Sequence, residues 1–259
     1  MPKFSANLSM LFTEVPLLER FAAAARAGFA AVEIQFPYEC SIDALRARLL
    51  ENNLQLVLHN LPAGNWSSGD RGIACLPDRR AEFRAGVELA VRYAVALGCP
   101  RLNCLAGVAS GREARDTLID NLRFAARVLA DAGLMLLIEP LNSRDVPGFF
   151  LTRSQQALEI IDAVSAPNLL LQFDAYHMQI MEGDLALTLQ RHLERIGHIQ
   201  IADTPGRHEP GTGEIDFDSL LPWLDEMSYS GWVGCEYRPR TNTLEGLEWL
   251  RRFQQRVAS

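Results

Sequence analysis

Residues 113–139, EARDTLIDNLRFAARVLADAGLMLLIE, contain the unit that the rest of the chain repeats. A stretch of helical period is followed by Gly133, where a helix C-cap is expected, and then by a short apolar run, 135–139, that is typical of a buried strand. Glycines follow two other helical stretches in the same way, at Gly28 and Gly98. The pattern therefore predicts a chain of alternating helices and parallel strands.

Eight strands and eight helical stretches of this kind are found along the chain. We expect the strands at 4–8, 31–34, 54–59, 101–105, 135–139, 169–174, 198–202 and 233–237. We expect the helices near 16–27, 41–52, 78–97, 113–132, 153–165, 184–195, 217–228 and 243–256. Eight repeats favour an α/β fold closed into a (β/α)8 barrel, or TIM barrel, and we expect 1–259 to form one such domain. An open doubly wound sheet is the alternative, but its usual glycine-rich turn is missing after the first strand.

Composition excludes several classes of function. The net charge of -7 provides no basic surface for nucleic acid. No apolar run is long enough to span a membrane, and the N-terminal residues lack the zones of a signal peptide. The five cysteines are scattered, which predicts reduced thiols and a cytoplasmic location. Lys3 is the only lysine and precedes the first strand, so we do not expect a Schiff-base mechanism.

Polar side chains stand at the carboxyl ends of four successive predicted strands, where barrel enzymes carry their catalytic groups. They are Glu139, Asp174, Gln200 and Glu236. Each carboxylate could instead pair with an arginine or cap a helix. Four oxygen-bearing groups in this pattern are also able to converge on one divalent cation, and Mg²⁺ and Mn²⁺ prefer such ligands. We expect a Mg²⁺ or Mn²⁺ site, with zinc fitting less well because the set contains no cysteine or histidine.

A second group of residues is expected on the loops that follow the strands, on the same face of the barrel. These candidate ligands for an acidic substrate are His59, His177, Arg207, His208 and Arg238. Arginine can hold a carboxylate through two parallel hydrogen bonds, although Arg207 and Arg238 could equally form surface ion pairs. The long segment 61–77 could close over the mouth through Trp66 and Ile73, or be an ordinary surface loop.

We interpret the side chains of His192, His198 and Cys235 as structural. His198 lies two residues before Gln200 on the same strand and is expected deeper in the core, while His192 falls on a helix surface. Cys235 should point away from Glu236 into the helix layer. The sequence has no Ser-His-Asp arrangement and no GxSxG motif.

Two glutamates on either side of a small substrate suit proton transfer between adjacent carbons. One removes the proton next to a carbonyl, and the other returns a proton to the neighbouring carbon of a cis-enediol. Strands five and eight are three places apart in a barrel closed in sequence order. Glu139 and Glu236 are therefore expected to face each other across the mouth as the catalytic acid and base.

Nine stretches of the chain, in order, resemble the hydroxypyruvate isomerase family within the xylose isomerase-like barrel superfamily. The most specific are LHNLPAGNW from 58, LLIEPLN at 136–142, QFDAYHMQ at 172–179, GHIQIAD at 197–203 and GWVGCEYRP at 231–239. The resemblance implies interconversion of hydroxypyruvate and tartronate semialdehyde, with Glu139 and Glu236 as acid and base. It also implies that these two residues, Asp174 and Gln200 hold a metal. Histidine is common in the superfamily where this chain has Gln200, which leaves a weaker, neutral ligand.

Other functions remain open at this stage. A sister group acts on 2-oxo-tetronates, and the stretch LHNLPAG is more similar to the hydroxypyruvate group. A barrel hydrolase such as an apurinic endonuclease-like phosphodiesterase would need several metals and many histidines, whereas this chain has five histidines. A non-catalytic barrel that binds sugar acids would have no need of both glutamates. We expect a small-molecule substrate and no nucleic acid or membrane partner, and assembly as a homo-oligomer stays open.

Overall fold

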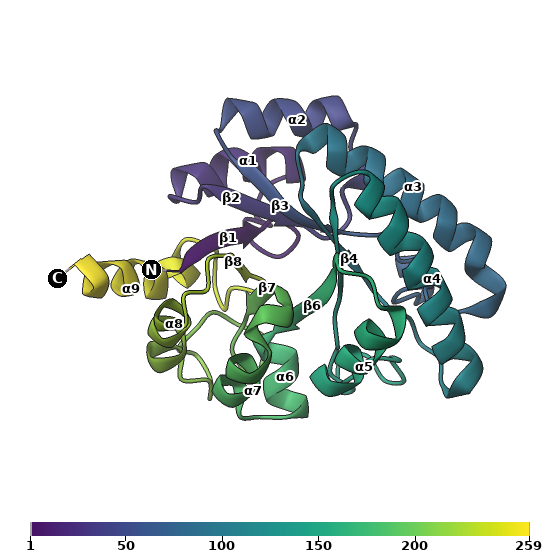
Figure 1. Ribbon diagram of the computed structural model, residues 1–259. Helices are drawn as coiled ribbons and strands as arrows, with labels where there is room; N and C mark the ends of the chain where they lie inside the picture. The colour runs from purple at the N-terminus through teal and green to yellow at the C-terminus, as the bar shows by residue number, and fades with distance from the viewer. Residues whose placement is uncertain (1, 259) are drawn as a thin grey trace.

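Eight parallel strands form a closed barrel in sequence order, with β8 pairing to β1 (Figure 1). The structure is a computed structural model that describes residues 2–258, with side-chain environments to Gln255. The strands are β1 (Lys3–Asn7), β2 (Ala31–Ile34), β3 (Gln55–Asn60), β4 (Arg101–Cys104), β5 (Met135–Ile138), β6 (Leu169–Asp174), β7 (Ile196–Ile201) and β8 (Trp232–Cys235). This arrangement confirms the predicted (β/α)8 barrel.

Helices surround the barrel on its outer side (Figure 1). They are α1 (Leu17–Arg26), α2 (Ile42–Glu51), α3 (Arg80–Leu97), α4 (Gly111–Asp131), α5 (Ser154–Val164), α6 (Ala175–Met181), α7 (Leu185–His192), α8 (Phe217–Glu226) and α9 (Glu248–Ala258). Among the residues described, none of these helices has both the length and the apolar character needed to cross a bilayer.

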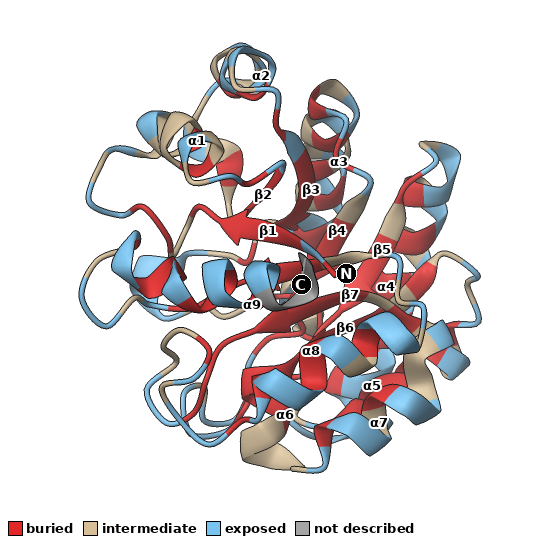
Figure 2. Ribbon diagram, turned by 90° about the vertical axis from the view of Figure 1, so that its left-hand side faces the viewer, coloured by how far each residue is buried: buried red, intermediate tan, exposed pale blue. Residues whose placement is uncertain are grey.

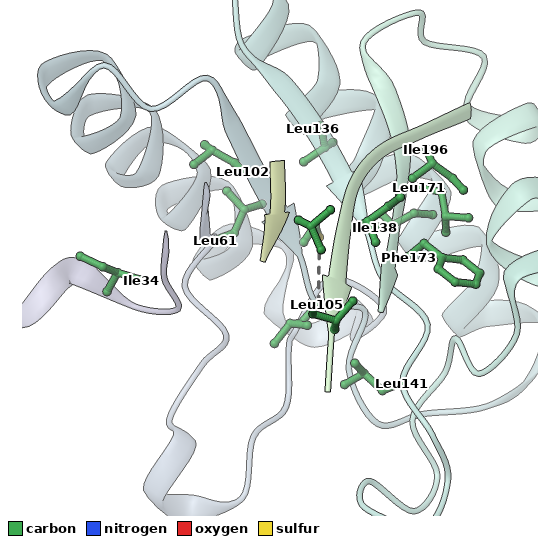
Figure 3. Packing of buried hydrophobic residues seen from close by; sticks show 14 of the residues in the cluster. Ile34, Leu61, Leu102, Leu105, Leu136, Ile138, Leu141, Leu171, Phe173 and Ile196 are labelled. Atoms are coloured by element: carbon green, nitrogen blue, oxygen red, sulfur yellow. Dashed lines mark hydrogen bonds between the residues drawn. The ribbon is translucent and has the colours of Figure 1, made fainter. Parts of the chain in front are cut away.

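The outer faces of the strands carry apolar side chains that pack under the helices. Leu136 and Ile138 of β5 and Leu171 and Phe173 of β6 are buried in the main core (Figure 3). Because successive residues of a strand point to opposite faces, the residues between them point into the barrel. The strands are accordingly buried along most of their length (Figure 2).

The inside of the barrel changes from apolar to polar toward the carboxyl ends of the strands. A small apolar cluster, which includes Ala31, Leu58 and Leu137, is packed separately from the main core. Buried polar side chains lie beside it and beyond it, among them Glu33, Gln172 and His198. A polar interior is costly unless its groups are hydrogen-bonded, so this part of the barrel is built around specific partners.

Two local features differ from the sequence prediction. Helix α6 begins directly after β6 and was not predicted, because its seven residues are too few to show a helical period. Its first turn is capped by Asp174, whose Oδ1 accepts a hydrogen bond from the Tyr176 backbone N–H at 2.9 Å. His177 therefore lies on a helix and not on a loop, and its position relative to Asp174 is fixed.

Candidate active site

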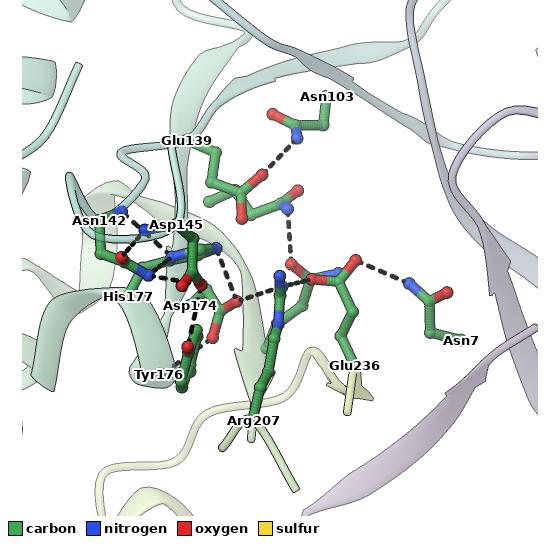
Figure 4. Close-up of polar contacts among 12 residues, drawn as sticks. Asn7, Asn103, Glu139, Asn142, Asp145, Asp174, Tyr176, His177, Arg207 and Glu236 are labelled. Carbon is green, nitrogen blue, oxygen red and sulfur yellow. Dashed lines mark hydrogen bonds and ion pairs between the residues drawn. The ribbon is translucent and has the colours of Figure 1, made fainter. Parts of the chain in front are cut away.

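Three buried carboxylates meet at the carboxyl ends of the strands, and we call them the acidic cluster: Glu139, Asp174 and Glu236 (Figure 4). Glu139 follows β5, Asp174 ends β6 and Glu236 follows β8. All three are 5% exposed or less. Their burial in one place is a strongly unfavourable arrangement for three negative charges, which must be offset by protonation, by a cation or by hydrogen bonds.

Glu139 is held by one amide. Asn103 Nδ2 donates to Glu139 Oε2 at 2.7 Å. Burial, followed by the charges of Glu236 and Asp174, raises the pKa of Glu139 well above its ordinary value. The raised pKa favours the protonated side chain, which is the form that a general acid needs.

Glu236 is held on the opposite side by two amides and an arginine. Its Oε1 accepts hydrogen bonds from Asn7 Nδ2 at 3.0 Å and Gln35 Nε2 at 2.9 Å, and its Oε2 accepts one from Arg207 Nη2 at 2.5 Å. Burial raises the pKa of Glu236, and the Arg207 charge works against that rise. Each of the two glutamates thus has one oxygen fixed by carboxamides.

Arg207 links two members of the acidic cluster. The same Nη2 that binds Glu236 lies 3.3 Å from Asp174 Oδ2, and the guanidinium stacks on the Tyr176 ring at 5.1 Å. Burial raises the pKa of Asp174 to about 7, although the Arg207 charge opposes it. One arginine facing three carboxylates leaves the site with more acidic groups than cations.

The loop that carries Arg207 is tied down by a single carboxylate, that of Asp203, which is fully buried. Its two oxygens accept five backbone N–H groups, those of Thr204, Gly211, Thr212, Gly213 and Ile215. Arg207 itself has a φ of 57°, a left-handed conformation that costs free energy in a non-glycine residue. Asp203 therefore holds the loop in the shape that directs Arg207 at the cluster.

Replacing Asp203 by asparagine tests this clamp. In Asp203→Asn an amide NH₂ replaces one accepting oxygen and faces backbone donors, so we expect about 3 kcal/mol less stability. We also expect a higher KM, because Arg207 is no longer fixed. Urea unfolding and steady-state kinetics measure the two effects. An unchanged KM would show that the loop keeps its shape without Asp203.

The proton on His177 is placed by the backbone. His177 Nδ1 accepts from the Asn142 backbone N–H at 3.1 Å, so in the neutral ring Nε2 carries the proton. Burial and the Arg207 charge lower the pKa of His177 well below its ordinary value and keep the ring neutral. Its Nε2 lies 3.6 Å from Asp174 Oδ2. His177 is thus a hydrogen-bond donor into the site and a poor metal ligand in this tautomer.

The donor atoms suit a hard divalent cation. Glu139 and Asp174 offer carboxylate oxygens that lie, together with a ring nitrogen of His177, within 4.8 Å of one another, and the two carboxylates are the ligands among these three in the tautomer described above. Buried amide oxygens of Asn103 and Gln172 have no hydrogen-bond partner among the described residues, and they are neutral donors of the kind Mg²⁺ accepts. A dication would also offset the excess of carboxylates around Arg207.

Not all four predicted metal ligands are grouped in this arrangement. Gln200 lies beside Asp174 in the strand register, but its amide is already engaged. Its Nε2 donates to Glu33 Oε2 at 2.8 Å, and its Oε1 accepts from Gln172 Nε2 at 2.7 Å. Arg207 occupies Glu236 Oε2. A cation held by all four would need Arg207 to move.

Comparison with known proteins places this site in a family. The family model of the xylose isomerase-like TIM barrel matches residues 21–253. The chain belongs to this family. It is 52% identical to a hydroxypyruvate isomerase of Escherichia coli, over 96% of this chain and 98% of that protein. It is 48% identical to a 2-oxo-tetronate isomerase of Cupriavidus necator, over 98% and 99%.

A solved structure agrees over the whole barrel. The crystal structure described as AP endonuclease, family 2, from Brucella melitensis has a TM-score of 0.95 and 44% identity, and the match covers 98% of this chain and 99% of that one. Together these relatives confirm the resemblance to the hydroxypyruvate isomerases within the xylose isomerase-like family.

Three of the predicted substrate ligands lie away from the acidic cluster. His59 is fully buried in β3, and its ring packs against Tyr38 with centroids 5.9 Å apart. His59 is level with Ile34 of β2 and Leu102 of β4, which both belong to the main core outside the barrel, so His59 points out into the helix layer, and the expectation that it faces the site was wrong. His208 Nδ1 lies 2.7 Å from the Arg238 carbonyl oxygen at the rim, and Arg238 is exposed.

His59 gives a pH dependence of stability. Burial lowers its pKa to about 4, whereas the unfolded chain keeps a value near 6.5. The unfolded state binds the proton first, so stability is full above pH 7 and is lost as the pH falls toward 4. Between pH 7 and 5 the loss is about 2 kcal/mol. His59→Leu should remove this part of the acid limb in urea titrations, while His192→Leu, at a partly buried histidine of α7 whose pKa burial lowers less, should remove a smaller part.

Of the two predicted lid residues in the long segment after β3, one is exposed and one is buried. Trp66 is 45% exposed. Its ring centroid lies 5.3 Å from that of Phe36 and 4.2 Å from Arg71 Cζ. Ile73 is 2% exposed and belongs to the main core, so the expectation that it covers the mouth was wrong. The exposed part of this segment is its tip, residues 65–69.

The sequence prediction gave no role to the carboxamides of the first four strands. These amide side chains lie at or near the carboxyl ends of β1 to β4, whereas the acidic cluster comes from β5, β6 and β8. They are Asn7, Gln35, Asn60 and Asn103. Three of them donate to Glu139 or Glu236. The strand-end rule that identified the acids would also have identified these amides.

Proposed function

We propose that this protein is an isomerase that interconverts hydroxypyruvate and tartronate semialdehyde. The observation that supports this most is that two buried glutamates, Glu139 and Glu236, lie in one site that also holds Arg207. Each glutamate has one carboxylate oxygen fixed by a side-chain amide. The similarity to an Escherichia coli hydroxypyruvate isomerase agrees with it.

The reaction requires one proton removal and one proton return. One glutamate takes a proton from C3 of hydroxypyruvate, the electron pair of that bond forms the C2=C3 double bond, and the negative charge passes to the C2 oxygen. The other glutamate then protonates C2, while the proton of the C3 hydroxyl passes to the C2 oxygen and C3 becomes the aldehyde. Arg207 and the Nε2–H of His177 provide positive charge and a hydrogen bond for the substrate carboxylate or carbonyl oxygen.

We further propose that Mg²⁺ or Mn²⁺ assists. When bound, the cation polarises the substrate carbonyl and so favours loss of the neighbouring proton. Glu139, Asp174, Gln200 and Glu236 are the residues that would hold it. The five free cysteines support a cytoplasmic location, which is also our proposal.

Removal of the cation tests its part. We expect EDTA-treated, metal-free protein to lose at least about 100-fold in kcat and to recover on addition of Mg²⁺ or Mn²⁺. The rate of hydroxypyruvate isomerisation before and after dialysis measures this. Full activity without metal would mean that the charge of Arg207 and the hydrogen bond from His177 suffice.

A substrate panel tests the function itself. The Cupriavidus necator relative supports the alternative, a four-carbon 2-oxo-tetronate. We expect kcat/KM for hydroxypyruvate to exceed that for each 2-oxo-tetronate. A reversed order would assign the protein to the four-carbon acids, and no turnover of any of them would refute the proposal. A DNA duplex with an abasic site should not be cleaved, since the chain carries a net charge of -7.

A further inference from the structure

A fourth carboxylate, Glu33 of β2, lies inside the barrel and takes no part in the chemistry proposed above. It is 1% exposed. Its Oε1 accepts from Ser5 Oγ at 2.6 Å and lies 2.7 Å from His198 Nε2. Its Oε2 accepts from Gln200 Nε2 at 2.8 Å and more weakly from Asn7 Nδ2 at 3.4 Å. Every contact is one that a carboxylate receives as an acceptor.

The neighbouring strand makes room for this side chain. A Cβ on Gly234 of β8 would lie 2.2 Å from Glu33 Oε1, so only glycine fits there. Burial alone would raise the pKa of Glu33, but the His198 ring, Ser5 and Gln200 outweigh it and hold the pKa below its ordinary value. The interior of the barrel is thus arranged to keep one negative group in this place.

Glu33 decides which way the Gln200 amide is turned. With Nε2 toward Glu33, the amide oxygen faces Gln172 of β6, which lies two residues before Asp174 on the same face of the strand. The opposite orientation would place the amide oxygen about 2.8 Å from a carboxylate oxygen with no proton between them. That contact is repulsive, so the orientation is set by Glu33. Gln200 Oε1 accepts one hydrogen bond and keeps a second lone pair.

We propose that Glu33 is a positioning residue that holds the Gln200 carboxamide with its oxygen away from Glu33 and toward β6, where Asp174 is the register neighbour of Gln200, so that a neutral amide can serve as a ligand of a divalent cation. The inference rests on the cation site proposed above and not on the identity of the substrate. His198 and Ser5 act through Glu33, since both contact its other oxygen.

Measuring the effect of Glu33→Gln in two variants of the chain, with Gln200 present and with Gln200→Glu, distinguishes a positioning role from a general structural role. Calorimetric titration of metal-free protein with Mn²⁺ gives the dissociation constant of each variant. In the otherwise unchanged chain, Glu33→Gln should weaken Mn²⁺ binding 10- to 100-fold, a typical cost of losing a group that orients a metal ligand. In a Gln200→Glu background both terminal atoms of the side chain at position 200 are oxygens, so there is no amide orientation to fix. There Glu33→Gln should cause no weakening, because it also removes a repulsion between carboxylates.

The controls and contrary outcomes are specific. Glu14→Gln makes the same change at a hydrogen-bonded carboxylate on the β1–α1 loop, and should leave the Mn²⁺ dissociation constant within about twofold. Equal weakening by Glu33→Gln in both backgrounds would mean a structural role and overturn the proposal. So would an unchanged constant in the first background, or no Mn²⁺ binding by the unsubstituted protein. If the Mn²⁺ dissociation constants change as expected but the protein does not turn over hydroxypyruvate, the proposed function is refuted and the positioning role of Glu33 is not.

A second measurement applies if Glu33→Gln does not fold. In the unsubstituted protein the Gln200 side-chain amide protons should exchange slowly with D2O, because Nε2 is bound to Glu33. The Gln200 carbonyl ¹³C resonance, and not the Nε2 resonance, should shift most when Mg²⁺ is added. Fast amide exchange, or a larger shift at Nε2, would overturn the proposal.

Discussion

Glu139→Gln and Glu236→Gln are each expected to lower kcat for hydroxypyruvate isomerisation by about 10²- to 10⁴-fold, the usual contribution of a positioned acid or base. Each glutamine keeps the size of the side chain but cannot carry the transferred proton. In Glu139→Gln the new NH₂ group can donate to Asn103 Oδ1, which has no partner now, so the fold should be retained. Steady-state rates and thermal unfolding measure both effects.

The two variants differ in stability, which provides an internal check. Burial and the neighbouring carboxylates raise the pKa of Glu139 and so disfavour its charged form, which means that its replacement by an amide should cost little stability. Glu236→Gln breaks the ion pair with Arg207 and should lower the unfolding temperature more. Glu14→Gln serves as the control for the substitution itself. Turnover close to that of the unsubstituted enzyme in either site variant would contradict the two-glutamate mechanism.

Arg207→Gln is expected to raise KM for hydroxypyruvate by about 30- to 1000-fold, the range lost when one partner of a buried charge pair is truncated. The arginine is the cation that contacts both Glu236 and Asp174 in the site. Its removal should also cost about 3 kcal/mol of stability in metal-free protein, since two buried carboxylates lose their partner.

Arg207→Lys distinguishes charge from geometry. Lysine keeps the charge but cannot form two parallel hydrogen bonds, so we expect it to restore stability more than KM. Added Mn²⁺ should offset part of the stability loss in Arg207→Gln, because a cation can replace the missing charge. A KM that stays unchanged in Arg207→Gln would place the substrate carboxylate elsewhere.

The barrel could be predicted from the sequence because its signals are local. Each strand is a short apolar run after a helical segment, and Gly28, Gly98 and Gly133 mark three of the boundaries. Most predicted ends agree with the structure to within two residues. Helix α6 was missed because seven residues do not show a period, and because Asp174 acts both as its cap and as a site residue.

The candidate site was predictable only in part. The strand-end rule identified Glu139, Asp174 and Glu236, since it needs only chain order. It gave the wrong side for His59, because the register of β3 decides which of two neighbouring polar residues points inward. Contacts across the barrel, such as Glu33 with Gln200, join residues 167 positions apart, and no local pattern encodes them.

A single turnover in D2O tests the two-glutamate mechanism most directly. Enzyme equilibrated in D2O, mixed in excess with hydroxypyruvate and quenched before product exchange, should give tartronate semialdehyde with deuterium at C2. This result is predicted because the proton delivered to C2 comes from the second glutamate, which has exchanged with solvent, and not from C3 of the substrate. Protium at C2 would mean that one group carried the substrate's own proton between the carbons, and it would contradict separate roles for Glu139 and Glu236.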